Sequence, residues 1–447
     1  MIEENNSRKH WKTVISSDIL DIRDGTHDTP KYVNENGVPL ITSKNLKENK
    51  IDFENISYIS KDDHIEISKR SKVEEGDILF AMIGTIGNPA IIRGDANFSI
   101  KNVALFKKNE DVILPAFLVN YLRSSIFEKQ LSERKLLKGT TQKFIPLGNL
   151  RSINIPLPPL PEQQLIVSKI DELLSDLDNG KQQLITAQQQ LKVYRQSLLK
   201  WAFEGKLTNK NVKEGELPKG WILKKFIDIG TWKGGGTPSK SRNDFWENGS
   251  IFWVSPKDMK SQRIIDTIDK ITSDAIQNSS TKLIPKGSIL FVVRSGILRR
   301  TLPVALTVCD VTVNQDIQAF TPDEVLPEYI YWYVTAKNDD IRKNCSKDGT
   351  TVESIESSLL KNYYIPICSL DEQQRIIGEL ESKLTICDKI EEIISQSLLQ
   401  AESLRQSILK KAFEGKLVSL NYDSDDEVDK HEMGIAAEEA ASYKKRS

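Results

Sequence analysis

The sequence is poor in cysteine and contains no long apolar run. Its four cysteines are separated by 36, 23 and 19 residues, at Cys309, Cys345, Cys368 and Cys387. No CxxC pair is present, so neither a zinc ribbon nor a disulfide framework is expected. The longest apolar runs, such as 78–83, are far shorter than the roughly 18 residues that span a bilayer. We therefore expect a soluble protein of a reducing cytoplasm, with neither a membrane span nor a secretion signal.

Signatures of catalysis are also missing. The four histidines are scattered at His10, His27, His64 and His431, and neither HExxH nor GxSxG occurs. The glycines of KGGGTPSK at 233–240 lack the order of a phosphate-binding loop. Two ExK sequences, at 204–206 and 414–416, have the spacing of some nuclease metal sites, but each follows a predicted helix rather than a strand. No catalytic, cofactor-binding or metal-binding residue is predicted.

The chain has almost no net charge, with 62 Lys and Arg against 63 Asp and Glu. Binding to nucleic acid needs positive charge, so the total alone argues against such a partner. The regions differ, however: the sums are +2 for 1–160, 0 for 161–207, +3 for 208–369, -2 for 370–420 and -4 for 421–447. Near-neutrality is therefore an average over mildly basic globular regions and an acidic end, and it no longer excludes a DNA partner.

The clearest positive signal is an internal repeat. EQQLIVSKI at 162–170 returns as EQQRIIGEL at 372–380, and RQSLLKWAFEGKL at 195–207 returns as RQSILKKAFEGKL at 405–417. Both copies are displaced by 210 residues, and the ungapped alignment of 161–207 with 371–417 contains 18 identities in 47 positions. The chain is thus predicted to be a tandem duplication followed by a tail.

The repeated segments have the periodicity of long helices that pair. Their apolar residues advance by alternating steps of three and four, which is typical of a left-handed coiled coil. A proline or acidic start and a glycine at the end fit the two ends of each helix. The predicted seam of the helix pair consists of Ile166, Ile170, Leu177, Leu184, Leu191, Leu198, Ile376, Leu380, Ile390, Ile394, Leu404 and Ile408.

The remaining regions read as globular domains. Short apolar runs after a glycine, such as 77–80 and 288–291, predict strands, and helices are expected near 115–129 and 327–341. The predicted fold class is α+β, with two mixed domains joined by two long antiparallel coiled-coil helices. The predicted boundaries are 1–155 and 208–365 for the domains, 156–207 and 366–418 for the helices, and 419–447 for an acidic, disordered tail.

The repeated helices resemble a known family. Two variable regions of about 150 residues, each followed by a helix that begins PLPPLPEQQ or SLDEQQ and ends in AFEGKL, are similar to the specificity subunit of type I restriction-modification enzymes. The stretches DGTHDTP at 24–30, GDILFAMIGTIGN at 76–88, KGTTQKFIP at 138–146, GGTPSK at 235–240 and DGTTVESI at 348–355 resemble parts of its target-recognition domains.

The resemblance implies a subunit without catalytic activity of its own. Each target-recognition domain would read one half of a split, asymmetric DNA sequence, and the helix pair would fix the spacer and bind two modification (methyltransferase) subunits. Those subunits would bring S-adenosylmethionine, and restriction (helicase-nuclease) subunits would bring ATP and magnesium chemistry. The complex would defend a prokaryotic cytoplasm against phage DNA.

Side chains on predicted turns are the candidates for DNA contact, because arginine suits guanine, asparagine suits adenine, and threonine often holds phosphate. In the first domain they are Thr26, His27, Lys44, Asn45, Thr140, Thr141 and Lys143. In the second they are Thr237, Ser239, Lys240, Lys257, Arg294, Ser295, Thr350 and Thr351. For the glycine-threonine turns, a purely structural role is an equal alternative.

Two other function classes remain open from sequence alone. A coiled-coil scaffold that joins protein partners without reading DNA would show the same repeat. A stand-alone nuclease or methyltransferase is disfavoured, because its motifs are missing.

Overall fold

The computed structural model describes residues 10–34, 37–47, 50–209, 211–213, 215–347 and 352–418. The described residues form two compact units, the first from those within 10–184 and 396–418 and the second from those within 185–395. The predicted tail 419–447 and two candidate DNA-contact residues, Thr350 and Thr351, lie outside the described residues. No helix in the described ranges is long and apolar enough to cross a membrane.

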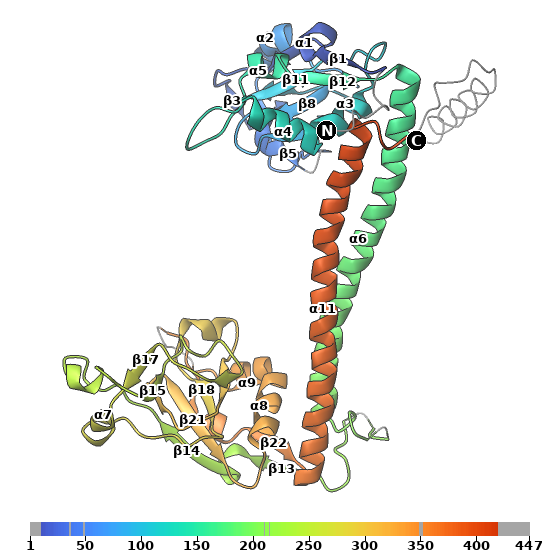
Figure 1. Cartoon of the computed structure of the whole chain (residues 1–447). Helices are drawn as coiled ribbons and strands as arrows, with labels where there is room; N and C mark the ends of the chain where they lie inside the picture. The colour runs from blue at the N-terminus through green and yellow to red at the C-terminus, as the bar shows by residue number, and fades with distance from the viewer. Residues whose placement is uncertain are drawn as a thin grey trace, which may run out of the picture. The chain divides into compact units, whose positions relative to one another are not determined.

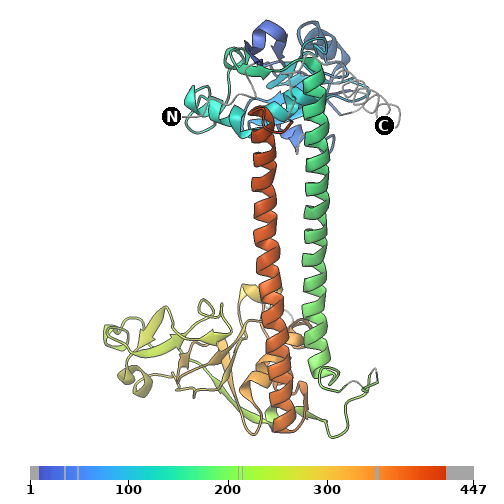
Figure 2. The same ribbon diagram turned by 45° about the vertical axis from the view of Figure 1, so that its right-hand side comes forward.

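Two long helices confirm the predicted α+β class with paired helices. Helix α6 (Leu160–Phe203) and helix α11 (Leu370–Phe413) each contain 44 residues, and each passes from one unit into the other (Figure 1). Within each unit the two helices run side by side in opposite directions (Figures 1 and 2). Gly205 and Gly415 follow the helices with φ of 75° and 68°, the left-handed conformation expected of a glycine cap.

The helix seam is partly wrong in the prediction. Eight of the twelve predicted seam residues are buried and Leu177 and Leu184 are half-buried, but Ile390 is 41% and Leu404 is 51% exposed. One position further along, Glu391 and Arg405 face the partner helix instead. Glu391 binds Arg195 at 2.8 Å, and Arg405 binds Asp178. The residues that face the partner helix at these two positions are charged. A prediction based on apolar residues therefore chose the preceding residues, Ile390 and Leu404.

The same ion pair occurs in both units. Arg195 binds Asp388 at 2.7 Å in the second unit, and Arg405 binds Asp178 in the first. Each pair is related to the other by the 210-residue displacement of the repeat. Since Asp388 and Asp178 are mostly exposed, the pairs add little stability.

The first domain contains two four-stranded sheets, and the pairs β1-β12 and β5-β6 form two-stranded ones. Its central antiparallel sheet has the order β2-β11-β8-β9, and a second has the order β10-β4-β7-β3. The strands are β1 (Lys12–Ile15), β2 (Ile22–Asp24), β3 (Tyr32–Val33), β4 (Val38–Thr42), β5 (Leu46–Lys47), β6 (Lys50–Ile51), β7 (Ser57–Ile59), β8 (Ile78–Ala81), β9 (Gly87–Ile91), β10 (Ser99–Lys101), β11 (Val103–Phe106) and β12 (Asn154–Leu157). The short helices are α1 (Ser16–Ile19), η2 (Ser43–Asn45), α2 (Lys61–Ser71), α3 (Pro115–Leu122), α4 (Ser125–Glu133) and α5 (Leu147–Arg151).

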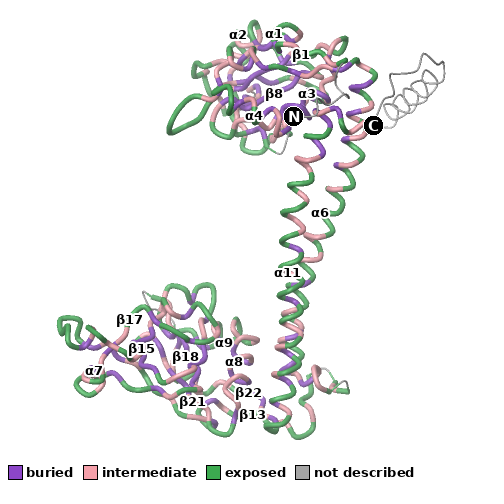
Figure 3. The backbone as a smooth tube through the Cα atoms, in the orientation of Figure 1, coloured by how far each residue is buried: buried purple, intermediate pink, exposed green. Residues whose placement is uncertain are grey.

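The second domain repeats this plan with a five-stranded sheet, β14-β21-β18-β19-β16, and a three-stranded one, β17-β15-β20. Its strands are β13 (Ile222–Lys225), β14 (Gly230–Gly234), β15 (Ile251–Val254), β16 (Arg263–Ile264), β17 (Asp269–Ile271), β18 (Ile289–Val292), β19 (Val304–Thr307), β20 (Thr312–Val313), β21 (Ile317–Pro322) and β22 (Tyr364–Ile367). Its short helices are η3 (Phe226–Asp228), η4 (Asn243–Phe245), α7 (Ser273–Gln277), η5 (Gly296–Arg299), α8 (Pro327–Ala336), α9 (Asn338–Asn344) and α10 (Ser357–Lys361). The central strands β8 and β18 are buried throughout (Figure 3).

Each core is completed by a helix from the other half of the sequence. In the first unit, the ring of Phe413 at the end of α11 lies 5.1 Å from Phe117 and 5.4 Å from Tyr121. In the second, the ring of Phe203 at the end of α6 lies 5.2 Å from both Tyr329 and Tyr333. The packing therefore repeats along with the sequence. The last turn of α11 packs into the core of the first unit, and the last turn of α6 packs into the core of the second.

Candidate DNA interface

Turns from several strands meet at one edge of the first domain. Asp24 pairs with Ala104, and Val103 pairs with Ala81, so β2, β11 and β8 have their ends at the same edge of the sheet. Thr42 and Lys101 end the neighbouring strands together, and the Gly84 N–H donates to the Lys143 carbonyl at 3.2 Å. We call this surface the first loop edge; it comprises 25–28, 43–45, 82–87, 101–102 and 138–144.

Asn102 holds the first loop edge together. It has a φ of 56°, its N–H donates to the Thr26 carbonyl at 3.3 Å, and its own carbonyl accepts from the Ser43 hydroxyl at 3.1 Å. Its side-chain oxygen lies 2.9 Å from Nδ1 of His27. This role was not predicted, and the only sequence signal at the position is that Asn102 matches Asn314 in the internal repeat.

His27 lies between two oxygen acceptors. Its Nε2 is 2.7 Å from Asp24 Oδ2, and Asp24 also binds Arg70. The hydrogen bond to Asp24, followed by the one to Asn102, raises the pKa of His27 above its ordinary value. Only a protonated imidazole can donate from both nitrogens, so the surroundings favour a positive, half-exposed His27 at this edge. Arg70 belongs to a basic cluster with Lys69 and Lys72 in the sequence, whereas Asp24 is a functional candidate that was not predicted.

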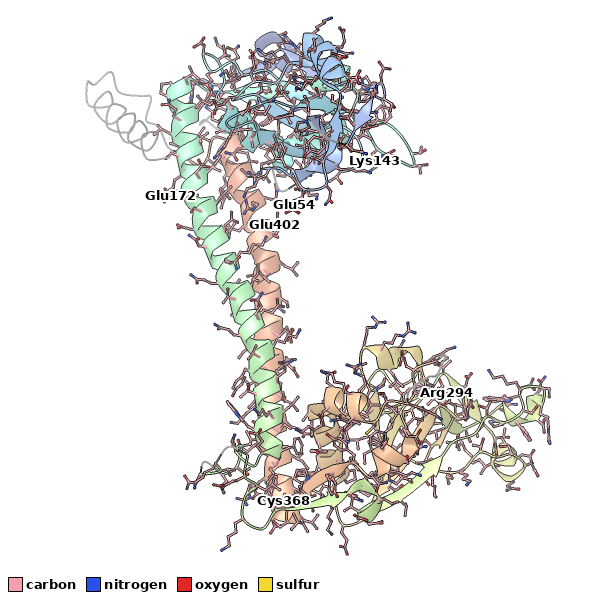
Figure 4. The ribbon with its side chains drawn as sticks, turned by 180° about the vertical axis from the view of Figure 1, so that it is seen from behind. Glu54, Lys143, Glu172, Arg294, Cys368 and Glu402 are labelled. Atoms are coloured by element: carbon pink, nitrogen blue, oxygen red, sulfur yellow. The ribbon has the colours of Figure 1, made fainter. Side chains whose placement is uncertain are left out.

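The other predicted residues of the first domain fall into two groups. Lys44 is exposed, and Thr140, Thr141 and Lys143 are exposed on a loop closed by the backbone pairing of Lys138 with Phe144. Figure 4 labels Lys143 where this loop projects from the domain. Thr26 is half-buried, and its N–H donates to the Ile100 carbonyl at 3.0 Å.

Asn45 is a correction to the predicted set. Its side chain is 8% exposed, its Oδ1 accepts from the backbone and hydroxyl of Thr42, and its Nδ2 donates to the Asp52 carbonyl at 3.2 Å. These bonds use both ends of the amide to hold the loop, so Asn45 is not available to a base in this conformation.

A second loop edge is built in the same way from 235–240, 255–258, 293–296, 313–316 and 352–355. Gly234 pairs with Gln318 and Val292 pairs with Ile317, so β14, β21 and β18 end together. Gly236 donates to the Val313 carbonyl at 2.9 Å. A Cβ on Gly235 would lie 2.1 Å from the Asn314 carbonyl oxygen, so the close approach requires glycine there.

The side chains of the second loop edge are held by their neighbours. Arg294 Nε donates to Asp316 Oδ1 at 2.7 Å while more than half of the Arg294 side chain stays exposed, and Figure 4 labels it in this domain. Thr237 donates to Gln315, and the Ser239 hydroxyl lies 2.8 Å from that of Ser241. Ser295 accepts from the Ile297 N–H at 3.5 Å, so its hydroxyl caps η5.

Lys240 and Lys257 are exposed, and neither forms an ion pair with any residue that the structure describes. These lysines suit phosphate, whereas the fixed guanidinium of Arg294 suits the edge of a guanine. Among the described residues, no group of three His, Cys, Asp or Glu side chains could hold a metal ion. The two edges present hydrogen-bonding and cationic groups.

Comparison with known proteins agrees with this arrangement. The family model for the type I restriction modification DNA specificity domain matches residues 8–187 and 218–400. The specificity subunit of the EcoR124I/EcoR124II type I restriction enzyme of Escherichia coli is 39% identical over 266 residues, which is 58% of this chain and 60% of that subunit. The chain thus matches less than two thirds of the length of that relative.

Other relatives match over more of the chain. The EcoKI specificity subunit of Escherichia coli strain K12 is 26% identical over 406 residues, covering 87% of this chain and 84% of that protein. Among solved structures, the HsdS subunit of Thermoanaerobacter tengcongensis has a TM-score of 0.61 at 20% identity, covering 93% of this chain and 99% of its own. A chain from a study of complex assembly in a type I system has a TM-score of 0.69 at 19% identity, covering 91% and 98%.

At such low identity the two solved structures support the fold alone. The family model is decisive, because its two matches cover most of both halves of the sequence. The chain belongs to the type I restriction-modification DNA specificity family.

Proposed function

We propose that this chain is the DNA-reading specificity subunit of a type I restriction-modification complex. The first loop edge would read one half-site and the second loop edge the other, with the helix pair setting the unspecified spacer between them. The chain would carry out no catalysis by itself. This proposal extends family membership to a specific role for each half of the molecule.

The proposal is supported by one observation: the two loop edges match in sequence position but carry different charged side chains. Thr26 and Thr237, Ser43 and Ser255, and Asn102 and Asn314 are matching residues of the internal repeat, so corresponding sequence positions lie on both edges. The charged groups of the two edges differ, since the first edge carries a His27–Asp24–Arg70 cluster and the second an Arg294–Asp316 pair. Different groups favour different bases, so the target is expected to be bipartite and non-palindromic.

We assign the functional parts as recognition domains 1–155 and 208–365, helices 156–207 and 366–418, and an acidic tail 419–447. The helices would bind two modification subunits, which supply S-adenosylmethionine for adenine methylation, and restriction subunits would add magnesium-dependent, ATP-driven cleavage. The site of action would be the cytoplasm of a prokaryotic cell. The repeat supports two equivalent binding positions for modification subunits, because each unit contains one pair of antiparallel helix segments.

The test is methylome sequencing of cells that express this chain with its modification subunit. We expect a single split motif with two different halves. If no split motif is methylated although the complex assembles, the proposal is wrong. Exchanging residues 1–155 for those of another specificity subunit should change one half of the motif only, and a change in both halves would refute the assignment of one half-site to each domain.

A further inference from the structure

A cavity beside the second loop edge is lined mainly by positive side chains. Its volume is about 380 Å³, and its polar lining comes from Arg299, Arg342, Lys343, Ser346, Glu353 and Ser354. Three of these residues are cations and one is an anion, so the lining has a formal charge of +2. Arg299 belongs to a basic cluster with Arg294 and Arg300 in the sequence, whereas Arg342 and Lys343 were not predicted to contact DNA.

The cavity shares a wall with the proposed reading surface. The Ser295 N–H donates to the Glu353 carbonyl at 3.1 Å, and the Ile355 N–H donates to the Val293 carbonyl at 2.8 Å. Arg294 therefore lies on one of two paired backbone segments, and Glu353 and Ser354 lie on the other. A DNA strand in contact with Arg294 would pass close to the mouth of the cavity.

Arg342 is held in place but has hydrogen-bonding capacity left. Its Nη1 donates to the Arg299 carbonyl at 3.1 Å, and its Nη2 lies 3.3 Å from Asp339. Its buried Nε has no hydrogen-bond partner among the residues that the structure describes. A buried donor without a partner costs free energy, and a bound anion oxygen would supply the acceptor after a small shift of the side chain.

The other two cations are available at the rim. The side chain of Arg299 is 71% exposed and is held only loosely, with its Nε 3.3 Å from Glu353 Oε1. Lys343 is exposed in the last turn of α9, and it makes no ion pair with a described residue. A basic residue at the end of a helix is favourable by itself, so exposure of Lys343 alone would prove nothing. The combination with a cavity and an unpaired Nε is what indicates a ligand.

We propose that this cavity is a phosphate subsite, which holds a backbone phosphodiester of the DNA beside the half-site that the second loop edge reads. The proposal rests on the proposed function of the chain and adds a defined position for the DNA backbone. Arg299, Arg342 and Lys343 neutralise the phosphate without contacting a base. Because phosphate contacts set the register of a protein on the duplex, the subsite positions Arg294 over one base pair.

The test uses the full-length chain assembled with its modification subunit. DNA affinity is measured by fluorescence anisotropy against salt from about 50 to about 200 mM, on a duplex with the methylated motif and on a scrambled duplex. Arg299→Gln and Lys343→Gln are each expected to reduce the magnitude of the slope of log K against log salt by up to about 0.9, the contribution of one phosphate, with an equal loss on both duplexes. Arg342→Gln is expected to lower it at least as much.

The matched control is Lys224→Gln, which removes an exposed lysine from β13 at the junction with the long helices. Its slope is expected to equal that of the unchanged protein. Loss of Arg342 could unfold the domain, so the test relies on Arg299→Gln and Lys343→Gln alone. Thermal unfolding of each variant is measured in parallel. The subsite proposal is wrong if Arg299→Gln and Lys343→Gln leave the salt dependence of DNA binding unchanged. It is also wrong if they weaken binding to the motif duplex only.

A small anion is the competing occupant. If pyrophosphate at constant ionic strength raises the melting temperature of the unchanged protein but not of Arg342→Gln, and the DNA slopes of the rim variants stay unchanged, the cavity takes a free anion and the subsite proposal is wrong. Failure of the unchanged complex to bind any duplex would instead count against the proposed function itself, so the two failures are distinguishable.

Discussion

At the scale of single residues, the two loop edges use charged groups that are held by neighbours rather than freely solvated. Arg294 is fixed by Asp316 at 2.7 Å, and Asp24 holds both His27 and Arg70. A fixed donor loses less side-chain entropy on binding than a free one. The exposed lysines of the same edges lack such partners among the described residues. The two kinds of residue should therefore respond differently to substitution.

Arg294→Ala is expected to relax the specificity of the second half-site. Loss of a bidentate contact to guanine costs about 1 to 3 kcal/mol of discrimination against the wrong base. Competition binding with duplexes that vary one base pair at a time measures this. Lys143→Ala serves as the comparison, because a phosphate contact should weaken all duplexes alike. Equal losses on all duplexes for Arg294→Ala would show that it binds phosphate.

His27 is expected to make DNA binding depend on pH. Its folded pKa is raised by the hydrogen bond to Asp24, so the charge is fully present below the ordinary value near 6.5 and is lost as pH rises through the folded pKa. The small stabilisation of the folded chain is lost over the same interval. Affinity for any duplex should thus fall as the pH rises from the ordinary value near 6.5 through the raised pKa of His27.

The comparison for this effect is His27→Gln, which keeps a side-chain donor but cannot be charged. Its affinity should vary less with pH than that of the unchanged protein, measured at constant ionic strength. A variant with the same pH dependence would assign the effect to other groups, and His27 would then be only a structural residue of the turn.

At the scale of secondary-structure elements, the long helices could be predicted and the loop edges could not. Repeated sequence, steps of three and four, and the glycine caps predict two long helices at 156–207 and 366–418, and α6 and α11 lie within these ranges, with each end four or five residues inside the predicted bound. The predicted seam is wrong at Ile390 and Leu404, which are exposed. Periodicity identifies apolar residues only, whereas the residues that face the partner helix here are the charged Glu391 and Arg405. The loop edges depend on strand register, which arises from contacts between distant residues such as Asn102 and Thr26.

Substitutions four residues apart on α11 test the corrected seam. Ile394 is 4% exposed and Ile390 is 41% exposed. Ile394→Ala should lower the free energy of unfolding by about 2 kcal/mol or more, because it removes buried apolar surface and leaves a cavity. Ile390→Ala should change it by less than about 0.5 kcal/mol. Urea denaturation followed by circular dichroism gives both values. Equal effects would restore the seam predicted from the sequence.

At the scale of the whole molecule, each recognition domain is completed by a helix end from a distant part of the sequence. The first unit needs the end of α11 and the second needs the end of α6, since Phe413 and Phe203 lie in the two cores. A boundary drawn at the sequence level, such as 155 or 365, therefore separates residues that fold together. This explains why an exchange of domains must preserve the apolar contacts made by the last turn of the opposite helix.

Paired substitutions at these two phenylalanines test the crossed arrangement. Both side chains are buried, at 0% exposure for Phe413 and 5% for Phe203, and loss of a buried phenylalanine typically costs about 3 to 5 kcal/mol. Phe413→Ala should reduce hydrogen-exchange protection in β8 and β11, at the other end of the sequence. Phe203→Ala should instead reduce protection in β18 and β21. If each substitution loosened only the domain that precedes it in the sequence, the helix ends would pack within their own copy of the repeat, and the crossed architecture would be wrong.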